Sequence, residues 1–193
     1  GHRITIQGVK KFIRRSHDQF IIAEIGCGGG DNLKAIHHWN KKRHNIKYIG
    51  VDLNEACIGF AKTNCKELNA TFIHSDYSTV IFETPPDIIF SSLFCHHFSN
   101  EQLGLMLNWL VQLSVRGFFI NDLQRNRLAF HSIGLLTNLF SKSYLVKNDA
   151  PISVLRGFIR KEWDGLFLKA GINQYSIDWK WAFRYLITVG HEQ

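Results

Sequence analysis

A glycine-rich turn is the part of this sequence best suited to chemistry. Residues 20–25 are apolar except for Glu24 and predict a buried strand, and Gly26-Cys27-Gly28-Gly29-Gly30 follows it directly. Glycines after a strand let the backbone approach a ligand and turn its N–H groups toward that ligand. By itself, this spacing indicates only that a nucleotide-like ligand binds at the end of a strand.

Acidic side chains around the turn discriminate between classes of ligand. Asp31 stands where a dinucleotide-binding turn has its third small residue, and Glu24 lies two residues before the first glycine. A carboxylate at the start of the following helix would repel a pyrophosphate. The same carboxylates would attract S-adenosylmethionine, which carries an ammonium and a sulfonium group. The alternative for Glu24 is a carboxylate that only accepts backbone N–H bonds.

Carboxylates also follow the next two predicted strands. Asp52 ends the strand at 48–52, where an acid can accept bonds from both ribose hydroxyls. Its neighbour Leu53 is then placed to pack on an adenine ring. Asp76 follows the strand at 70–74 and, in a methyltransferase, would bind the adenine amino group with Tyr77 beside it. The alternative for Asp76 is the cap of a turn or helix.

Candidate groups for the reaction follow the fourth and fifth predicted strands. His96 and His97 come after the strand at 87–93, and an imidazole can take a proton from a phenol or enol near neutral pH. The alternative is that one or both histidines pack structurally or cap the next helix. Asp122 and Gln124 end the strand at 117–122 and, with Phe130, are expected to shape the acceptor pocket.

The frame that must position these groups is an alternation of strands and helices. Helices are predicted at 31–43, 54–68 and 99–115, the last opened by a capping box at Ser99 and Gln102. This order predicts a doubly wound α/β sheet with the ligand at the carboxyl ends of the strands. A long helix at 125–141, a less regular stretch at 142–160, a helix at 161–170 and an antiparallel hairpin from 172–179 and 183–189 complete the chain. We expect 125–163 to cap the acceptor pocket, with ordinary core packing as the alternative.

Composition excludes several other classes of protein. The 193 residues are 45% hydrophobic and 20% charged, which fits one domain with its own core. No apolar run is long enough to span a bilayer, and no secretory signal is present. The four cysteines include no C-x-x-C pair, so we expect free thiols and a cytoplasmic protein. The net charge of +7 is spread over short clusters at 10–11, 14–15 and 41–43, which favours solvated helix faces over a nucleic-acid surface.

Together these motifs resemble the class I S-adenosylmethionine-dependent methyltransferases. Residues 23–30, 50–53 and 75–77 resemble the glycine, acidic and adenine motifs of that family, and 86–98 resemble the fourth-strand motif of its small-molecule branch, which includes quinone-biosynthesis enzymes. Residues 121–125 and 148–154 resemble a bacterial subgroup found in polyketide contexts. The resemblance implies a Rossmann-like sheet of order 3-2-1-4-5-7-6 with strand 7 antiparallel. It also implies cofactor contacts from Glu24, Gly26, Cys27, Gly28, Gly30, Asp52, Leu53, Asp76, Tyr77, Ser92 and Leu93.

The implied activity is methyl transfer to oxygen or carbon of a small, apolar acceptor of the aromatic, quinone or polyketide kind. Orientation dominates this reaction, and a base is needed only for a protonated acceptor. We expect no metal, because the order Asn121-Asp122 reverses the Asp-Asn pair of metal-dependent catechol enzymes. An RNA methyltransferase and a non-catalytic cofactor-binding module are the alternatives, although the motifs of amino and cytosine methyltransferases are absent. We expect one domain over 1–193. The start at Gly1 without Met fits either a tag remnant or a chain cut at its N-terminus, and in the second case part of the native protein is missing.

Overall fold

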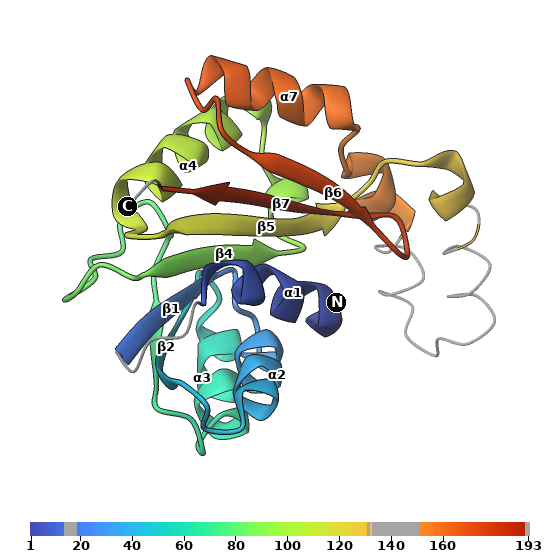
Figure 1. Ribbon diagram of the computed structural model, residues 1–193. Coiled ribbons are helices and arrows are strands. Elements are labelled where there is room, and N and C mark those ends of the chain that lie inside the picture. The colour runs from blue at the N-terminus through green and yellow to red at the C-terminus, as the bar shows by residue number, and fades with distance from the viewer. Residues whose placement is uncertain (14–18, 131, 133–150, 192–193) are drawn as a thin grey trace.

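A sheet of seven strands forms the centre of the computed structural model. The structure describes residues 1–13, 19–130, 132 and 151–191 (Figure 1). The strand order is β3-β2-β1-β4-β5-β7-β6. Strands β1 to β5 pair in parallel, whereas β7 pairs antiparallel with both β5 and β6. The predicted order and the antiparallel seventh strand are therefore confirmed. The strands are β1 Gln19–Ile25, β2 Asn45–Asp52, β3 Ala70–His74, β4 Ile88–Ser92, β5 Gly117–Leu123, β6 Ser176–Lys180 and β7 Arg184–Gly190.

Helices cover both faces of the sheet, which explains why the central strands are apolar throughout. Along β1, Phe20 and Ile22 pack toward α1 (His2–Phe12) and α2 (Asp31–Asn40), on the same side as α3 (Glu55–Asn64) (Figure 1). Ala23 and Ile25 pack toward α4 (Asn100–Leu113) and α7 (Arg160–Lys169) on the other side. A short 3₁₀ helix, η1 (Cys95–His97), joins β4 to α4.

Some helix boundaries agree with the prediction and others differ from it. Helix α2 ends at Asn40, because Lys41 and Lys42 adopt left-handed conformations with φ of 46° and 61°. The capping box of α4 at Ser99 and Gln102 is confirmed. Residues 151–156 are helical, so the prediction of an irregular stretch is wrong there. Of the predicted helix at 125–141, residues 127–130 are helical and most of the remainder lies outside the described residues.

Helix α1 was not predicted from the sequence, yet it lies over the centre of the sheet. Its apolar side chains Val9 and Phe12 are buried, and Phe12 stacks on Phe119 of β5. Gly8 lets the helix approach that ring, since a Cβ atom there would lie 2.5 Å from Phe119 Cδ2. Phe119 is itself fully buried and stacks on Phe90 at 4.8 Å, so it has little room to yield.

Replacing Gly8 with Ala is therefore expected to destabilise the protein by about 1–3 kcal/mol, the usual cost of overpacking a core. Gly59→Ala in α3 is the matched control, because a Cβ atom there meets nothing within 4 Å. That exposed helical site should gain up to about 1 kcal/mol from alanine. Urea unfolding of both variants measures the two changes, and a Gly8→Ala protein as stable as Gly59→Ala would contradict the close docking of α1.

Candidate active site

The turn after β1 is tied to the end of β2 and to the segment after β4. The N–H groups of Gly26 and Cys27 donate to the carbonyl oxygen of Val51 at 2.9 and 3.0 Å. Gly26 has a φ of +68°, and its missing side chain leaves room for the ring of Phe94, which a Cβ atom would meet. The predicted glycine motif and the fourth-strand motif therefore lie against each other at the carboxyl edge of the sheet.

Asp52 organises the turn through both of its carboxylate oxygens. Oδ2 accepts the N–H of Gly28 at 2.8 Å, and Oδ1 accepts the N–H of Asn54 at 2.9 Å. The neighbouring Leu53 is 68% exposed, which leaves an apolar side chain free at the rim. Both residues lie beside the glycine turn, at the place where the sequence predicted a ribose and an adenine.

Glu24 is a buried carboxylate with one unused oxygen. Its Oε1 accepts a bond from the amide of Asn32 at 2.7 Å, whereas Oε2 is buried without a hydrogen-bond partner among the described residues. Burial is the main reason that the pKa of Glu24 is raised to about 8, and the nearby charges of Asp31 and Asp52 raise it further against the Asn32 bond. A buried acceptor without a partner is costly, so this site fits a cationic group.

Asp76 and Tyr77 lie in the loop after β3. Asp76 Oδ1 closes a local turn by accepting the backbone N–H of Ser78 at 2.8 Å and its hydroxyl at 2.6 Å. This is the capping role that the sequence left open beside the adenine role. The ring of Tyr77 packs edge-on against Phe94, Phe98 and Trp109, which places it next to the fourth-strand motif.

A polar network beneath α1 connects the ends of β4 and β5. Asn121 Nδ2 donates to Ser92 Oγ at 3.1 Å and to Thr5 Oγ1 at 3.4 Å, and Thr5 in turn donates to Asn32 at 3.3 Å. Leu93 has a φ of +57°, a strained conformation for a leucine, and is partly exposed. The sequence did not indicate Thr5, because α1 itself was not predicted. It did not indicate Asn32 either, because the interpretation there rested on the charge of the neighbouring Asp31.

The two histidines of η1 differ sharply in environment. His96 is buried, and its Nδ1 lies 2.8 Å from Oδ1 of Asp122. His97 is exposed, and its ring lies 4.3 Å from that of His96. Partial burial, followed by the charge of His96, lowers the pKa of His97. Asp122 is 0% exposed and in contact with His96, so its carboxylate is engaged inside the protein, and its role in the acceptor pocket stays a prediction.

The predicted cap is only partly described. Gln124 is held by the β6–β7 hairpin, because its Oε1 accepts the indole N–H of Trp179 at 2.9 Å. Phe130 is half-buried. Phe158 and Trp163 are buried in the core beside α4 and α7, so at these two positions the structure fits core packing, the alternative to a cap. Residues 131 and 133–150 lie outside the described part of the chain.

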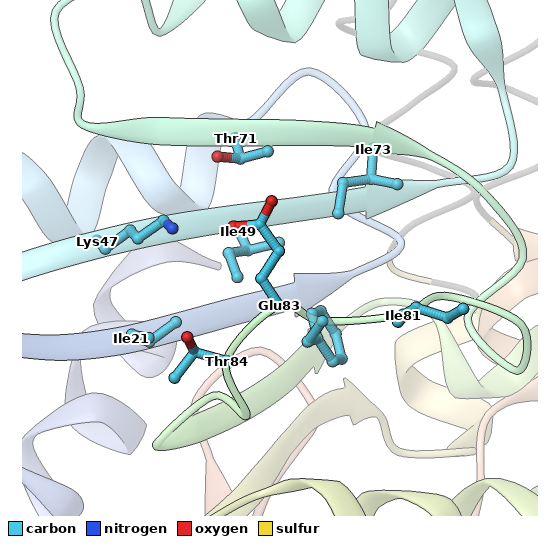
Figure 2. A pocket seen from close by; sticks show the side chains of 9 residues that line it. Ile21, Lys47, Ile49, Thr71, Ile73, Ile81, Glu83 and Thr84 are labelled. Atoms are coloured by element: carbon cyan, nitrogen blue, oxygen red, sulfur yellow. The ribbon is translucent and has the colours of Figure 1, made fainter.

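A separate groove of about 280 Å³ lies over β1, β2 and β3 (Figure 2). Its floor is formed by Ile21, Ile49 and Ile73, and Ile81 and Glu83 of the β3–β4 connection border it. The groove exists because residues 75–87 contain no helix to cover this part of the sheet. None of the predicted site residues lines it, so the candidate active site is the carboxyl edge and not this groove.

Three further findings concern the described part of the chain. No helix there has both the length and the apolar character needed to cross a membrane. No group of three or more His, Cys, Asp or Glu side chains is arranged to hold a metal ion. All four cysteines are free.

Residues 22–116 match the family described as "Methyltransferase domain". The mRNA cap guanine-N(7) methyltransferase of Schizosaccharomyces pombe is 29% identical over 124 residues, which is 56% of this chain, and the match spans only 33% of that relative. Among solved structures, the plantazolicin methyltransferase BpumL in complex with S-adenosylhomocysteine superposes with a TM-score of 0.71 at 19% identity, over 93% of this chain and 68% of that one. Magnesium protoporphyrin IX methyltransferase from Synechocystis PCC 6803, also with bound S-adenosylhomocysteine, gives a TM-score of 0.64 at 14% identity, over 98% and 80%.

Proposed function

Since this chain belongs to the class I methyltransferases, by its family match over 22–116 and by its fold, we propose that it methylates oxygen or carbon of a small, apolar, aromatic, quinone or polyketide-like acceptor. S-adenosylmethionine is the cofactor of this family, and when bound it supplies the electrophilic methyl group. The observation that carries the methyl-transfer part of this proposal is the buried, unpartnered Oε2 of Glu24 beside the glycine turn, which fits a cationic cofactor. The acceptor class is supported by the resemblance of residues 86–98 to the small-molecule branch of the family.

The chain's own residues then have distinct tasks. The turn at Gly26 and Gly28, held by Asp52, receives the cofactor, and Glu24 balances its positive charge. His96, buried after β4 and held by Asp122, takes the proton from a hydroxyl acceptor. We further propose that 1–193 is one domain whose segment 125–163 caps the acceptor pocket.

The test of cofactor class is thermal unfolding with S-adenosylhomocysteine and, separately, with NAD. A ligand at a hundredfold excess over its Kd stabilises the native state by about 2.7 kcal/mol. For a chain of this length the Tm should then rise by about 5–10 °C. We expect that shift with S-adenosylhomocysteine alone, and stabilisation by NAD alone would overturn the proposal. A protein that binds the cofactor but methylates nothing in a broad screen of phenols and quinones would instead be a non-catalytic module.

RNA is a second candidate acceptor, supported by the net charge of +7 and by the similarity to the cap methyltransferase. The positions of the two basic clusters that lie in the described part of the chain argue against it. Residues 10–11 lie at the end of α1, and 41–43 lie between α2 and β2, so both precede the amino ends of strands. The candidate active site is at the opposite, carboxyl edge. RNA binding that weakens steeply with salt, together with methylation of a capped RNA, would favour this second candidate.

A further inference from the structure

The carboxylate of Asp122 is fully engaged inside the protein. Its Oδ2 accepts the N–H groups of Cys95 at 2.6 Å and Phe94 at 3.2 Å. Its Oδ1 accepts the N–H of Leu123 at 2.7 Å and contacts His96 Nδ1 at 2.8 Å. An ionised carboxylate only accepts hydrogen bonds, and here all of its acceptor positions are used.

This arrangement determines the tautomer of His96. Because Asp122 can only accept, Nδ1 of His96 must carry the hydrogen and donate it. In a neutral imidazole the other nitrogen, Nε2, then keeps its lone pair. The structure records no hydrogen-bond partner for Nε2 among the described residues, so the lone pair of this nitrogen is not used by them.

Three other titratable side chains lie near Asp122 and His96, namely Cys95, Arg184 and His97. Burial and the charge of Asp122 raise the pKa of the Cys95 thiol well above its usual value, which keeps it neutral. Burial lowers the pKa of Arg184 on β7, while the attraction of Asp122 opposes that effect. His97 carries the remaining imidazole, and Arg156 contributes a positive charge near it.

We propose that Asp122 is a positioning residue, which holds His96 with Nε2 unprotonated and directed to the acceptor. The proposal rests on the proposed methyl transfer, because it assigns Asp122 to the base of that reaction. In the step itself, the acceptor's O–H bond breaks, its electron pair stays on oxygen, and Nε2 of His96 takes the proton. The acceptor oxygen would form a bond to the methyl carbon that the cofactor supplies, while the bond from that carbon to sulfur breaks and the thioether leaves with the electron pair.

The first experiment reads the tautomer directly, without turnover. In protein labelled with ¹⁵N histidine, long-range ¹H–¹⁵N correlation spectra distinguish the protonated nitrogen of each neutral ring. We expect His96 in the unsubstituted protein to carry its hydrogen on Nδ1. Nε2-protonated His96 would overturn the proposal, whether or not an acceptor is ever found.

Asp122→Asn is the second experiment, since its amide can donate to Nδ1 and so favour the wrong tautomer. We expect Nε2 to become protonated and kcat to fall about 100-fold for phenol. For 4-nitrophenol, which is largely ionised at an assay pH of 8, kcat should fall less than about threefold because no base is needed. Equal losses with both phenols, or an unchanged tautomer in the variant, would contradict the role of Asp122.

Asp87→Asn is the matched control. Asp87 also accepts a backbone N–H, from Ile21 at 2.9 Å, and it pairs with Arg116 at 3.0 Å, but it lies at the amino edge of the sheet. This variant should change neither the His96 tautomer nor the ratio of the two phenol rates. S-adenosylhomocysteine binding separates the two proposals: its absence in the unsubstituted protein contradicts the proposed function, whereas its retention with a wrong tautomer contradicts the inference alone.

Discussion

Replacing His96 with Gln is expected to lower kcat for a protonated phenol acceptor about 100-fold, while the Kd for S-adenosylhomocysteine stays the same. General bases contribute about 10²–10⁴-fold to rates, and a loss of 100-fold corresponds to about 2.7 kcal/mol of transition-state stabilisation. Gln keeps an amide group that can bond to Asp122, so the buried carboxylate is not left unpaired. Steady-state kinetics and isothermal titration calorimetry measure the two quantities.

His97→Gln is the paired control for this prediction. His97 is exposed and has no recorded bond to Asp122, so its replacement should change kcat by less than about threefold, because the proposed base His96 keeps its contribution. Both variants replace a histidine with glutamine at neighbouring positions, so they differ only in which imidazole is removed. A larger loss in His97→Gln than in His96→Gln would transfer the base role to His97 and contradict the assignment made from burial.

The sequence predicted the parts of the fold that depend on local pattern. The strands alternate with helices of clear apolar spacing, and the glycine turn follows a strand, so a doubly wound sheet with its site at the carboxyl edge could be derived. The strand order came from the resemblance to the methyltransferase family and not from the local pattern. Helix α1 escaped because Gly8 and the charged pair at Lys10 and Lys11 interrupt its pattern, and no capping side chain precedes it. Its stability comes from tertiary contacts with Phe119, which local pattern does not contain.

The choice between His96 and His97 was also beyond the sequence. The two residues are neighbours in a 3₁₀ turn, and only a partner 26 residues away distinguishes them. Asp122 was placed correctly at the end of β5, but its direction was not predictable, because it depends on the path of the chain after β4. Glu24, in contrast, could be predicted as a cofactor contact from the sequence, because it lies two residues before the glycines. The structure adds that its Oε2 is buried without a hydrogen-bond partner among the described residues.

Cofactor affinity is expected to fall below pH 8 because Glu24 must lose its proton to balance a cation. Its pKa is raised to about 8 in the ligand-free protein, so the carboxyl group is mostly neutral at pH 6. If the cofactor requires the ionised form, its Kd rises nearly tenfold for each pH unit below 8. Calorimetry with S-adenosylmethionine at pH 6, 7 and 8 should show this trend, with close to one proton released per cofactor bound at pH 6.

Glu24→Gln isolates the effect from other titrating groups. An α-amino group, such as that of the cofactor, also titrates near pH 8, but its contribution is common to both proteins and cancels in the comparison. The variant should bind S-adenosylmethionine weakly at all three pH values, close to the affinity of the unsubstituted protein at pH 6.

The stability of the fold depends on pH in the opposite direction to cofactor affinity. The pKa of Glu24 in the native state is higher than its unfolded value of about 4.5, so the group contributes stability at low pH. That stability is lost as pH rises from about 4.5 to 8. Ligand-free protein should therefore lose stability relative to Glu24→Gln across that window, by up to about 1.4 kcal/mol per pH unit. If the two proteins respond to pH in parallel, in both binding and urea unfolding, Glu24 is not the group that responds to the cofactor's charge.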